Sequence, residues 1–469
     1  SSLYGPNAFG GVINIITKRS AETGANLSLT IGEHGFYGGT ATLKHTVGRT
    51  AHRLGLNKRA SAGYRHNTDF DINKFSYQGT ILIPDAPVNV YAGFTEREFG
   101  ANDFYSTAFP DQRESVRTTL IKAVSEIQLG ELFIVPQVHW RQNKDDFILD
   151  NTRPEWYRNK HTTDVYGGEV TAALENRFGR TAFGFEYGEE SIQSSNLGDH
   201  SRERGGIVLE HQAEFLDRIN LDLGAFAYYH SGYDWQVYPG IGLGYQLSDL
   251  SSVFINLGQA YRVPTFTDLY YTSPANIGNP DLQPERSRSY EAGYRWFNEI
   301  LTGNVAAFYR DGYNLIDWTR NQADSPWMVQ NIRDVNTYGA EIQLTFLIES
   351  VRNLTRIPRV ELKYAYLNSE TENLNAESKY LLNYLRHQLQ AGIHLLLPAG
   401  IRQSWVVRYN DRAGLNSYTL TDVRTQRQFG NFLLRLDITN LFDASYQEIP
   451  GVPMPGRWVR FGIETTLGE

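Results

Sequence analysis

Apolar and polar residues alternate with a period of two along much of this chain. The clearest segment places Ile219, Leu221, Leu223, Ala225, Ala227 and Tyr229 on one face and Asn220, Asp222 and Gly224 on the other. Near the end of the chain, Phe432, Leu434, Leu436 and Ile438 alternate with Arg435, Asp437 and Thr439. This period is that of a β-strand. One strand face therefore suits lipid, and the face with Arg435 and Asp437 suits an aqueous lumen.

The connections between these strands are of two kinds that alternate along the chain. Short turns are expected near Gly48, Asp85, Gly130, Phe178, Asp217, Asp249, Glu299, Leu354 and Ala399, with a last one around Arg427 and Gln428. Longer polar loops are expected over residues 96–115, 142–161, 262–286, 312–334 and 442–456. Short turns on one side and long loops on the other are typical of an up-and-down membrane barrel, and counting two strands per turn predicts about 22 antiparallel strands. A lumen of that width requires a plug.

Four motifs in a fixed order resemble one family. The first stretch has a turn at Tyr4-Gly5-Pro6-Asn7, then Gly10-Gly11 and the apolar strand Val12–Thr17. It closely resembles the end of the plug domain of TonB-dependent outer-membrane transporters. Residues 260–266 (AYRVPTF) and 278–285 (GNPDLQPE) look like the paired boxes that flank a long extracellular loop in these receptors, and residues 440–458, with Asn440-Leu441-Phe442-Asp443, look like their closing hairpin. Individually, the prolines in these motifs are explained by turn chemistry.

The resemblance implies both an architecture and a function. Residues 1–20 would be the C-terminal remnant of a plug domain, and residues 21–469 a transmembrane β-barrel in the outer membrane of a Gram-negative bacterium. Such a transporter binds a scarce metal chelate at its outer loops and imports it when a TonB-type inner-membrane complex, driven by the proton-motive force, acts on the plug. Cobalamin and ferric siderophores are the leading ligands, and the form of the paired boxes slightly favours the cobalamin-receptor branch.

The composition excludes several classes of protein and site. Hydrophobic residues are 41% of 469, and no run of about 18 apolar residues could cross a bilayer as a helix. The absence of cysteine excludes disulfides and thiolate metal sites. A net charge of −8 gives no basic footprint for nucleic acid. The chain implies no enzyme activity and no required cofactor; its expected partners are a metal chelate, the inner-membrane energising complex and outer-membrane lipid.

Two groups of residues are candidate binding sites. Aromatic residues in the expected outer loops could grip an aryl-rich or corrin-like ligand, or could pack loop against loop: Trp156, Tyr157, Tyr270, Tyr271, Trp318 and Trp327. Asp69, Asp71 and Asn73 have the D-x-D-x-N start of a calcium loop, although Lys74 and Thr80 stand where an EF-hand has its glycine and glutamate. A solvated loop is the alternative for these three residues.

Two other functions remain open. A passive porin would show the same alternation but leaves Ser1–Thr17 without a role. A barrel enzyme would need a histidine such as His139 or His230 beside a nucleophile, and no motif positions one.

Overall fold

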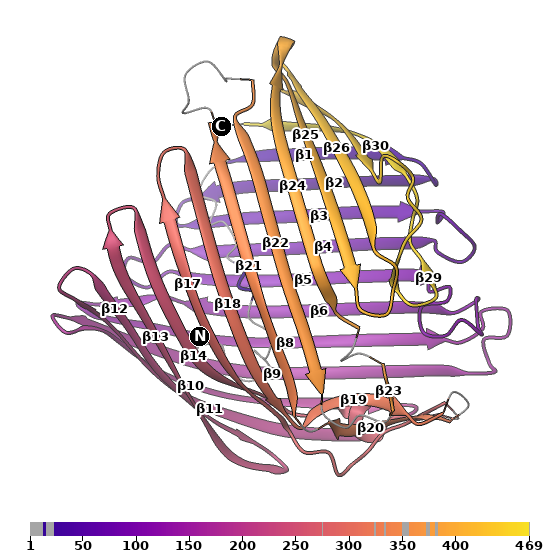
Figure 1. The fold of residues 1–469 in the computed structure, drawn as a ribbon, viewed down its shortest axis with the longest axis horizontal. Coiled ribbons are helices and arrows are strands. Elements are labelled where there is room, and N and C mark those ends of the chain that lie inside the picture. The colour runs from indigo at the N-terminus through magenta and orange to yellow at the C-terminus, as the bar shows by residue number, and fades with distance from the viewer. Residues whose placement is uncertain are drawn as a thin grey trace.

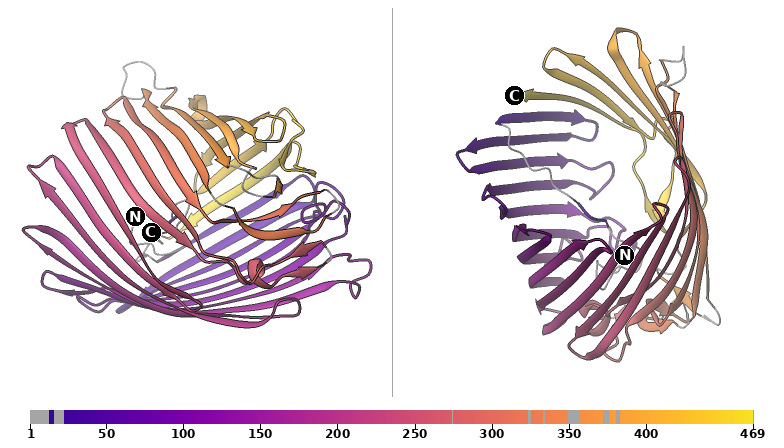
Figure 2. Two further views of the ribbon diagram at one scale, coloured as in Figure 1. Left: turned by 60° about the horizontal axis from the view of Figure 1, so that its bottom comes forward. Right: turned by 90° about the vertical axis from the view of Figure 1, so that its left-hand side faces the viewer.

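The computed structural model describes residues 13–15, 23–273, 275–322, 325–332, 334–348, 356–371, 376–379 and 383–468. Most of these residues belong to one antiparallel sheet that curls round and closes on itself, because β1 (Gly24–Gly32) pairs with β30 (Trp458–Leu467) from Ala25↔Leu467 to Gly32↔Arg460 (Figures 1 and 2). Among the described residues, no helix is long and apolar enough to cross a membrane.

The barrel wall has 22 strands in the described part of the chain, as the turn count predicts. Two of the segments, β6 and β7, pair with successive parts of β8 and together make one interrupted wall strand. The remaining neighbours follow in chain order. Between β1 and β30 the wall strands are β2 (Phe36–Val47), β3 (Thr50–Ser61), β4 (Phe70–Ile81), β5 (Val88–Gly100), β6 (Arg113–Ser125), β7 (Ile127–Leu129), β8 (Leu132–Ile148), β9 (Arg158–Asn176), β10 (Gly179–Ser194), β11 (Gly198–Phe215), β12 (Ile219–His230), β13 (Tyr233–Ser248), β14 (Ser251–Arg262), β17 (Glu285–Phe297), β18 (Leu301–Tyr313), β21 (Val335–Leu347), β22 (Arg359–Thr371), β24 (Leu385–Leu397), β25 (Ile401–Arg412), β26 (Tyr418–Phe429) and β27 (Phe432–Thr439).

Strand faces follow the predicted alternation. On β12, Leu223 is 41% exposed on the apolar face, whereas Tyr228 and His230 on the other face are 2% and 3% exposed. On β27, Arg435 and Asp437 share the inner face and form an ion pair, with Arg435 Nε 2.9 Å from Asp437 Oδ2. The barrel therefore presents an apolar surface to lipid and a charged surface to its lumen.

One turn was placed wrongly by the sequence pattern. Arg427 and Gln428 lie within β26, and the turn follows at Gly430 and Asn431, where Phe429 pairs with Phe432. Gly430 has a φ of +54°, which a two-residue hairpin requires and glycine adopts at no steric cost. The polar run before it continues the strand: Gln428 shares the lumen face with Arg424, and Arg427 lies on the opposite face, where its guanidinium is 4.3 Å from the Phe429 ring centre. The turn expected near Leu354 lies outside the described residues.

The long connections lie at one end of the barrel and fold into structure of their own. Three of them jointly form a five-stranded sheet, the loop sheet, which consists of β15 (Thr272–Ser273), β16 (Asn276–Ile277), β19 (Leu315–Arg320), β20 (Trp327–Ile332) and β23 (Glu377–Ser378). Figure 1 shows β19, β20 and β23 gathered at one end of the wall strands. A short helix, α1 (Phe266–Tyr270), belongs to the same loops, and a further hairpin pairs β28 (Gln447–Ile449) with β29 (Val452–Pro453). At the opposite end, η3 (Pro398–Gly400) forms one of the short turns.

The expected plug remnant, residues 1–20, lies almost entirely outside the described residues. Its boundary with the barrel stays a prediction.

Candidate ligand-binding site in the outer loops

The loop sheet has a hydrophobic core. Leu282 and Val329 are 1% and 2% exposed, and they pack with Leu269, Ile316 and Trp318. The members come from two different long connections, 263–284 and 314–334, and Tyr270, Tyr271 and Trp327 pack against them. Because burying this apolar area stabilises the loops, the outer end of the barrel is a folded surface on which side chains have fixed positions.

An ion pair joins the two boxes that flank the first of these connections. Arg262, the last residue of β14, lies opposite Glu285, the first of β17. The Arg262 guanidinium donates to both Glu285 oxygens, from Nε at 2.5 Å and from Nη2 at 2.6 Å. Glu285 is 5% exposed and also accepts from the Ile316 amide of β19 at 2.7 Å. This carboxylate therefore fixes the base of the connection and ties it to the loop sheet.

Helix α1 is held in place at both ends. Thr265 caps it, because its hydroxyl accepts from the Asp268 amide at 3.1 Å while the Asp268 carboxylate accepts from the Thr265 amide at 2.9 Å. The Arg202 guanidinium of β11 lies 4.5 Å from the Phe266 ring centre and donates to the Pro264 carbonyl at 2.7 Å. The Tyr270 ring stacks on His200 with 3.7 Å between ring centres. The helix therefore has a fixed position against the end of β11.

The six loop aromatics expected to bind ligand fall into two environments. The Tyr157 and Tyr271 hydroxyls form a hydrogen bond of 3.1 Å. The Tyr271 ring packs edge-on against Trp318, which is only 9% exposed. Burial raises the pKa of Tyr271, and its hydrogen bond with the Tyr157 hydroxyl raises the pKa further. Trp327 lies under the Arg320 guanidinium at 4.5 Å. With Tyr270 stacked on His200, five of the six contribute to packing between loops.

Trp156 is the exception. It is 52% exposed at the tip of the 149–157 connection, with the Arg153 guanidinium 4.6 Å from its ring centre and the Phe109 ring at 5.6 Å. Asp150 shapes this tip by accepting from the Thr152 hydroxyl and from Arg153, and these bonds lower its pKa to about 2. The Asp150 carboxylate therefore stays charged at neutral pH, and the tip holds the Trp156 ring toward solvent.

Sequence reasoning missed His200 and Arg202 as parts of this region. Both lie near the start of β11, just after the three-residue connection 195–197, and the only sequence signal there is a pair of basic side chains. Their partners are more than sixty residues away along the chain. Pattern analysis of one sequence cannot bring such segments together.

The candidate calcium residues lie on the outer face of the barrel. The Asp69 carboxylate pairs with Arg113 Nη1 at 3.1 Å, and the Asp71 carboxylate pairs with Lys58 Nζ at 2.5 Å. The Asn73 side-chain amide donates to Asp71 Oδ1 at 3.0 Å. Successive side chains on one strand face are about 7 Å apart, too far for all three to reach one ion without backbone movement. Across the described ranges, no three acidic, histidine or cysteine side chains converge on a metal position. The structure gives the calcium site no support, and it stays an untested prediction.

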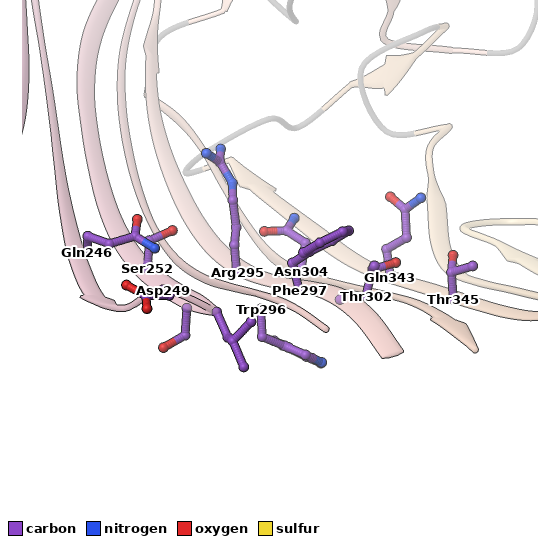
Figure 3. Close-up of a pocket in the computed structure, with 13 residues that line it drawn as sticks. Gln246, Asp249, Ser252, Arg295, Trp296, Phe297, Thr302, Asn304, Gln343 and Thr345 are labelled. Carbon is purple, nitrogen blue, oxygen red and sulfur yellow. The ribbon is translucent and has the colours of Figure 1, made fainter. Parts of the chain in front are cut away.

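A separate hollow of about 360 Å³ lies at the opposite, short-turn end of the barrel. It is bordered by the turn around Asp249 and by the ends of β17, β18 and β21. Figure 3 shows Arg295, Asn304 and Gln343 pointing to one side of the wall and Trp296 to the other. This hollow is at the far end of the barrel from the loop aromatics and is therefore separate from the candidate ligand site.

Comparisons with known proteins show which family has this architecture. The family model for the TonB dependent receptor-like β-barrel matches residues 5–441. The vitamin B12 transporter BtuB of Photobacterium profundum is 22% identical over 95% of this chain and 74% of its own length. BtuB of Vibrio vulnificus is 27% identical over 44% of this chain and 33% of its own length.

Solved structures agree in fold. The siderophore receptor PirA from Pseudomonas aeruginosa superposes with a TM-score of 0.80 at 15% identity, over 99% of this chain and 84% of that one. A mutant of the ferric enterobactin receptor PfeA from the same organism gives 0.79 at 16% identity, over 99% and 83%. The resemblance seen in the motifs is thereby confirmed. This chain belongs to the TonB-dependent receptor family and forms its β-barrel, which lies in the outer membrane of Gram-negative bacteria.

Proposed function

We propose that this protein is a TonB-dependent transporter that takes up a scarce metal chelate, either cobalamin or a ferric siderophore, using energy from a TonB-type inner-membrane complex. The observation that carries the proposal is the folded loop sheet with its aromatic core at the outer end of a closed barrel. A passive pore needs no such ordered outer surface. Relatives named for vitamin B12 and for siderophores both match this chain, so both ligand classes remain in the proposal.

The proposed contacts are the aromatic loop residues Trp156, Tyr157, Tyr270, Tyr271, Trp318 and Trp327. Trp156 presents the most exposed ring of the six, and the others hold the surface beside it through the packing described above. Exposed indole faces bind flat aryl or corrin-like groups by stacking and by burial of apolar area.

Calorimetric titration of the detergent-solubilised protein with cobalamin and with a panel of ferric siderophores tests this function. We expect saturable binding of one ligand class at micromolar concentration or below. Absence of binding to every member, together with ligand-independent conductance in planar bilayers, would contradict the proposal and favour a porin.

Replacing Trp156 by alanine should weaken binding of that ligand. A well-placed interface tryptophan contributes about 1–2 kcal/mol, so affinity should fall roughly 5- to 30-fold. The matched control is Phe178→Ala, which removes a ring that is 65% exposed at the short-turn end. Equal affinities for the wild type and the Trp156 variant would remove this residue from the site.

Calcium remains an optional partner in this proposal. If Asp69, Asp71 and Asn73 bind it, millimolar calcium should raise the melting temperature of the protein, since a ligand that binds only the folded state stabilises that state. The Asp71→Asn variant should lose the increase. An unchanged melting temperature in the wild type would end the calcium hypothesis.

The enzyme alternative is not retained, because the family to which the chain belongs is a transporter family. His139 and His230, the residues that such an activity would have needed, lie on barrel strands β8 and β12.

A further inference from the structure

The hydrogen-bonded wall has a break near its outer end, between β13 and β14. The ladder between these strands ends at Gly240↔Gly258, and residues 233–239 of β13 and 259–262 of β14 continue beyond it without facing each other. Pro239 is the first residue of β13 past the break, and it has no amide hydrogen with which to continue the ladder. The two strands therefore part at Pro239, although each keeps its neighbour on the other side.

A hollow of about 550 Å³, which we call the wall notch, lies on the outward side of this break. Small residues leave this space, because Ala225 pairs with Leu209 on one side and with Pro239 on the other. The larger residues that line it are apolar or aromatic and 40–52% exposed on the lipid-facing surface: Leu209, Leu223, Ile241, Leu257 and Tyr290. The wall notch is therefore an apolar recess that faces the acyl chains of the bilayer.

Aromatic residues close the break on the lumen side. Tyr238 and Tyr261 are 9% and 2% exposed, with 5.3 Å between their ring centres. Val208, Phe226 and Tyr228 pack with them in one buried cluster. This cluster separates the wall notch from the lumen, so the notch is open to the membrane and not to the transport path.

A row of tyrosines marks the depth of the wall notch in the membrane. Tyr290 pairs with Tyr309, and Tyr309 pairs with Tyr338, across adjacent strands at 37–44% exposure. Aromatic residues in such rows lie where acyl chains meet headgroups. Arg288 comes two residues before Tyr290 on the same strand face, toward the outer end. Arg288 is therefore at the level of the outer-leaflet headgroups, and the notch below it is at the level of the acyl chains.

Arg288 lines the outer rim of the wall notch, opposite Gln259 of β14. Within the part of the chain that the structure describes, its guanidinium forms no ion pair, and it is not bonded to Asp311, which lies opposite on β18. A guanidinium binds phosphate through two parallel hydrogen bonds, and cations near the headgroups attract anionic lipids. The rim is therefore complementary to a phosphate and the recess to an acyl chain.

We propose that the wall notch binds one lipid of the outer leaflet, with an acyl chain in the recess and a headgroup phosphate at Arg288. In a Gram-negative outer membrane this lipid is a glycolipid with phosphates on its sugars. The bound chain fills the space that the ladder leaves open, and it stabilises the folded barrel because it binds only that state. The site is on the outward face, so it is independent of the chelate that the lumen carries.

Native mass spectrometry of the detergent-solubilised protein tests this site, with diphosphoryl lipid A, phosphatidylglycerol and phosphatidylcholine as probes. We expect one lipid A molecule to bind at least about fivefold more tightly than phosphatidylcholine, the effect of one cation beside an anionic headgroup. Arg288→Gln should weaken lipid A binding by the same factor. Ala225→Leu fills the recess and should weaken it about tenfold, the effect of unburying about two methylene groups.

Two matched controls change the same outward surface outside the wall notch. Ala227→Leu enlarges the next outward residue of β12, which pairs with Val237 of β13. Lys144→Gln removes an exposed cation of β8 that shares its strand face with Val138, itself 61% exposed. Both controls should bind lipid A as the wild type does. Lipid A should raise the melting temperature of the wild type and the controls more than that of the two notch variants.

Three results would overturn the inference. The first is equal binding of all three lipids to the wild type, and the second is an unchanged affinity for lipid A in both Arg288→Gln and Ala225→Leu. The third is an equal loss of binding in the two controls, which shows a nonspecific layer of lipid around the barrel. Phosphatidylglycerol binding as tightly as lipid A overturns the assignment to the outer-leaflet glycolipid.

Discussion

Replacing Glu285 by alanine should destabilise the outer loops by about 1–3 kcal/mol, the cost of leaving buried donors without their acceptor. Glu285 is 5% exposed and accepts two bonds from Arg262 and one from the Ile316 amide. All three bonds lose their acceptor in the variant, and Arg262 keeps the Asp268 carboxylate, whose Oδ2 is 3.7 Å from Nη1. The Glu285→Gln variant should be milder, because its amide oxygen can still accept one of these bonds.

Hydrogen exchange and limited trypsin digestion would report this effect. We expect faster exchange at the Ile316 amide and new cleavage between residues 263 and 284, while the barrel keeps its resistance to unfolding in SDS at room temperature. Glu291→Ala is the control, since Glu291 lies on the same strand and, within the described residues, its carboxylate accepts one exposed bond, from Asn256 at 3.0 Å. Identical digestion patterns for the two variants would contradict the role given to Glu285.

Shortening Leu282 to alanine should cost about 2–5 kcal/mol in the loop sheet, as large-to-small substitutions in a packed core do. Leu282 is 1% exposed and packs with Leu269, Ile316, Trp318 and Val329. The loss should appear as a red-shifted tryptophan emission and as weaker ligand binding, because the packed aromatic residues lose their fixed positions. The barrel itself should still fold, since its strand pairing does not depend on this residue.

The control for Leu282 is another residue of the loop sheet. Met328 lies on β20 and is 55% exposed, so Met328→Ala removes a side chain of similar size without opening a cavity. We expect its fluorescence and binding to match those of the wild type. A Leu282 variant with unchanged emission and affinity would show that the cluster does not hold the ligand-binding surface.

Much of the barrel could be predicted from the sequence because its signals are local. Alternation in residues 219–229 identifies a strand within one segment, and turn residues such as Gly48 and Asp217 mark where a strand ends. The number of wall strands, 22, follows from counting two strands for each of these turns. The displaced turn at Gly430 shows the limit, since consecutive polar residues at the end of a strand have the composition of a turn.

The candidate site could not be predicted to the same degree. The loop sheet pairs Thr319 with Ser378 and Asn276 with Trp327, in strands too short to show any periodicity. Its aromatic residues were recognised, but their packing partners, such as His200 beneath Tyr270, lie on distant strands. The inner wall at the barrel closure likewise combines charged side chains from both ends of the chain, such as Arg59 and Arg435, which only closure of the barrel brings together.

Energy-dependent uptake is the most direct test of the central claim that this protein actively transports a metal chelate. Cells that depend on this protein would be given the radiolabelled chelate that binds in calorimetry, with and without an uncoupler of the proton-motive force. The account predicts accumulation above the external concentration, abolished by the uncoupler and by loss of the TonB complex. Entry that only follows the concentration gradient, unchanged by the uncoupler, would contradict it and identify a passive pore.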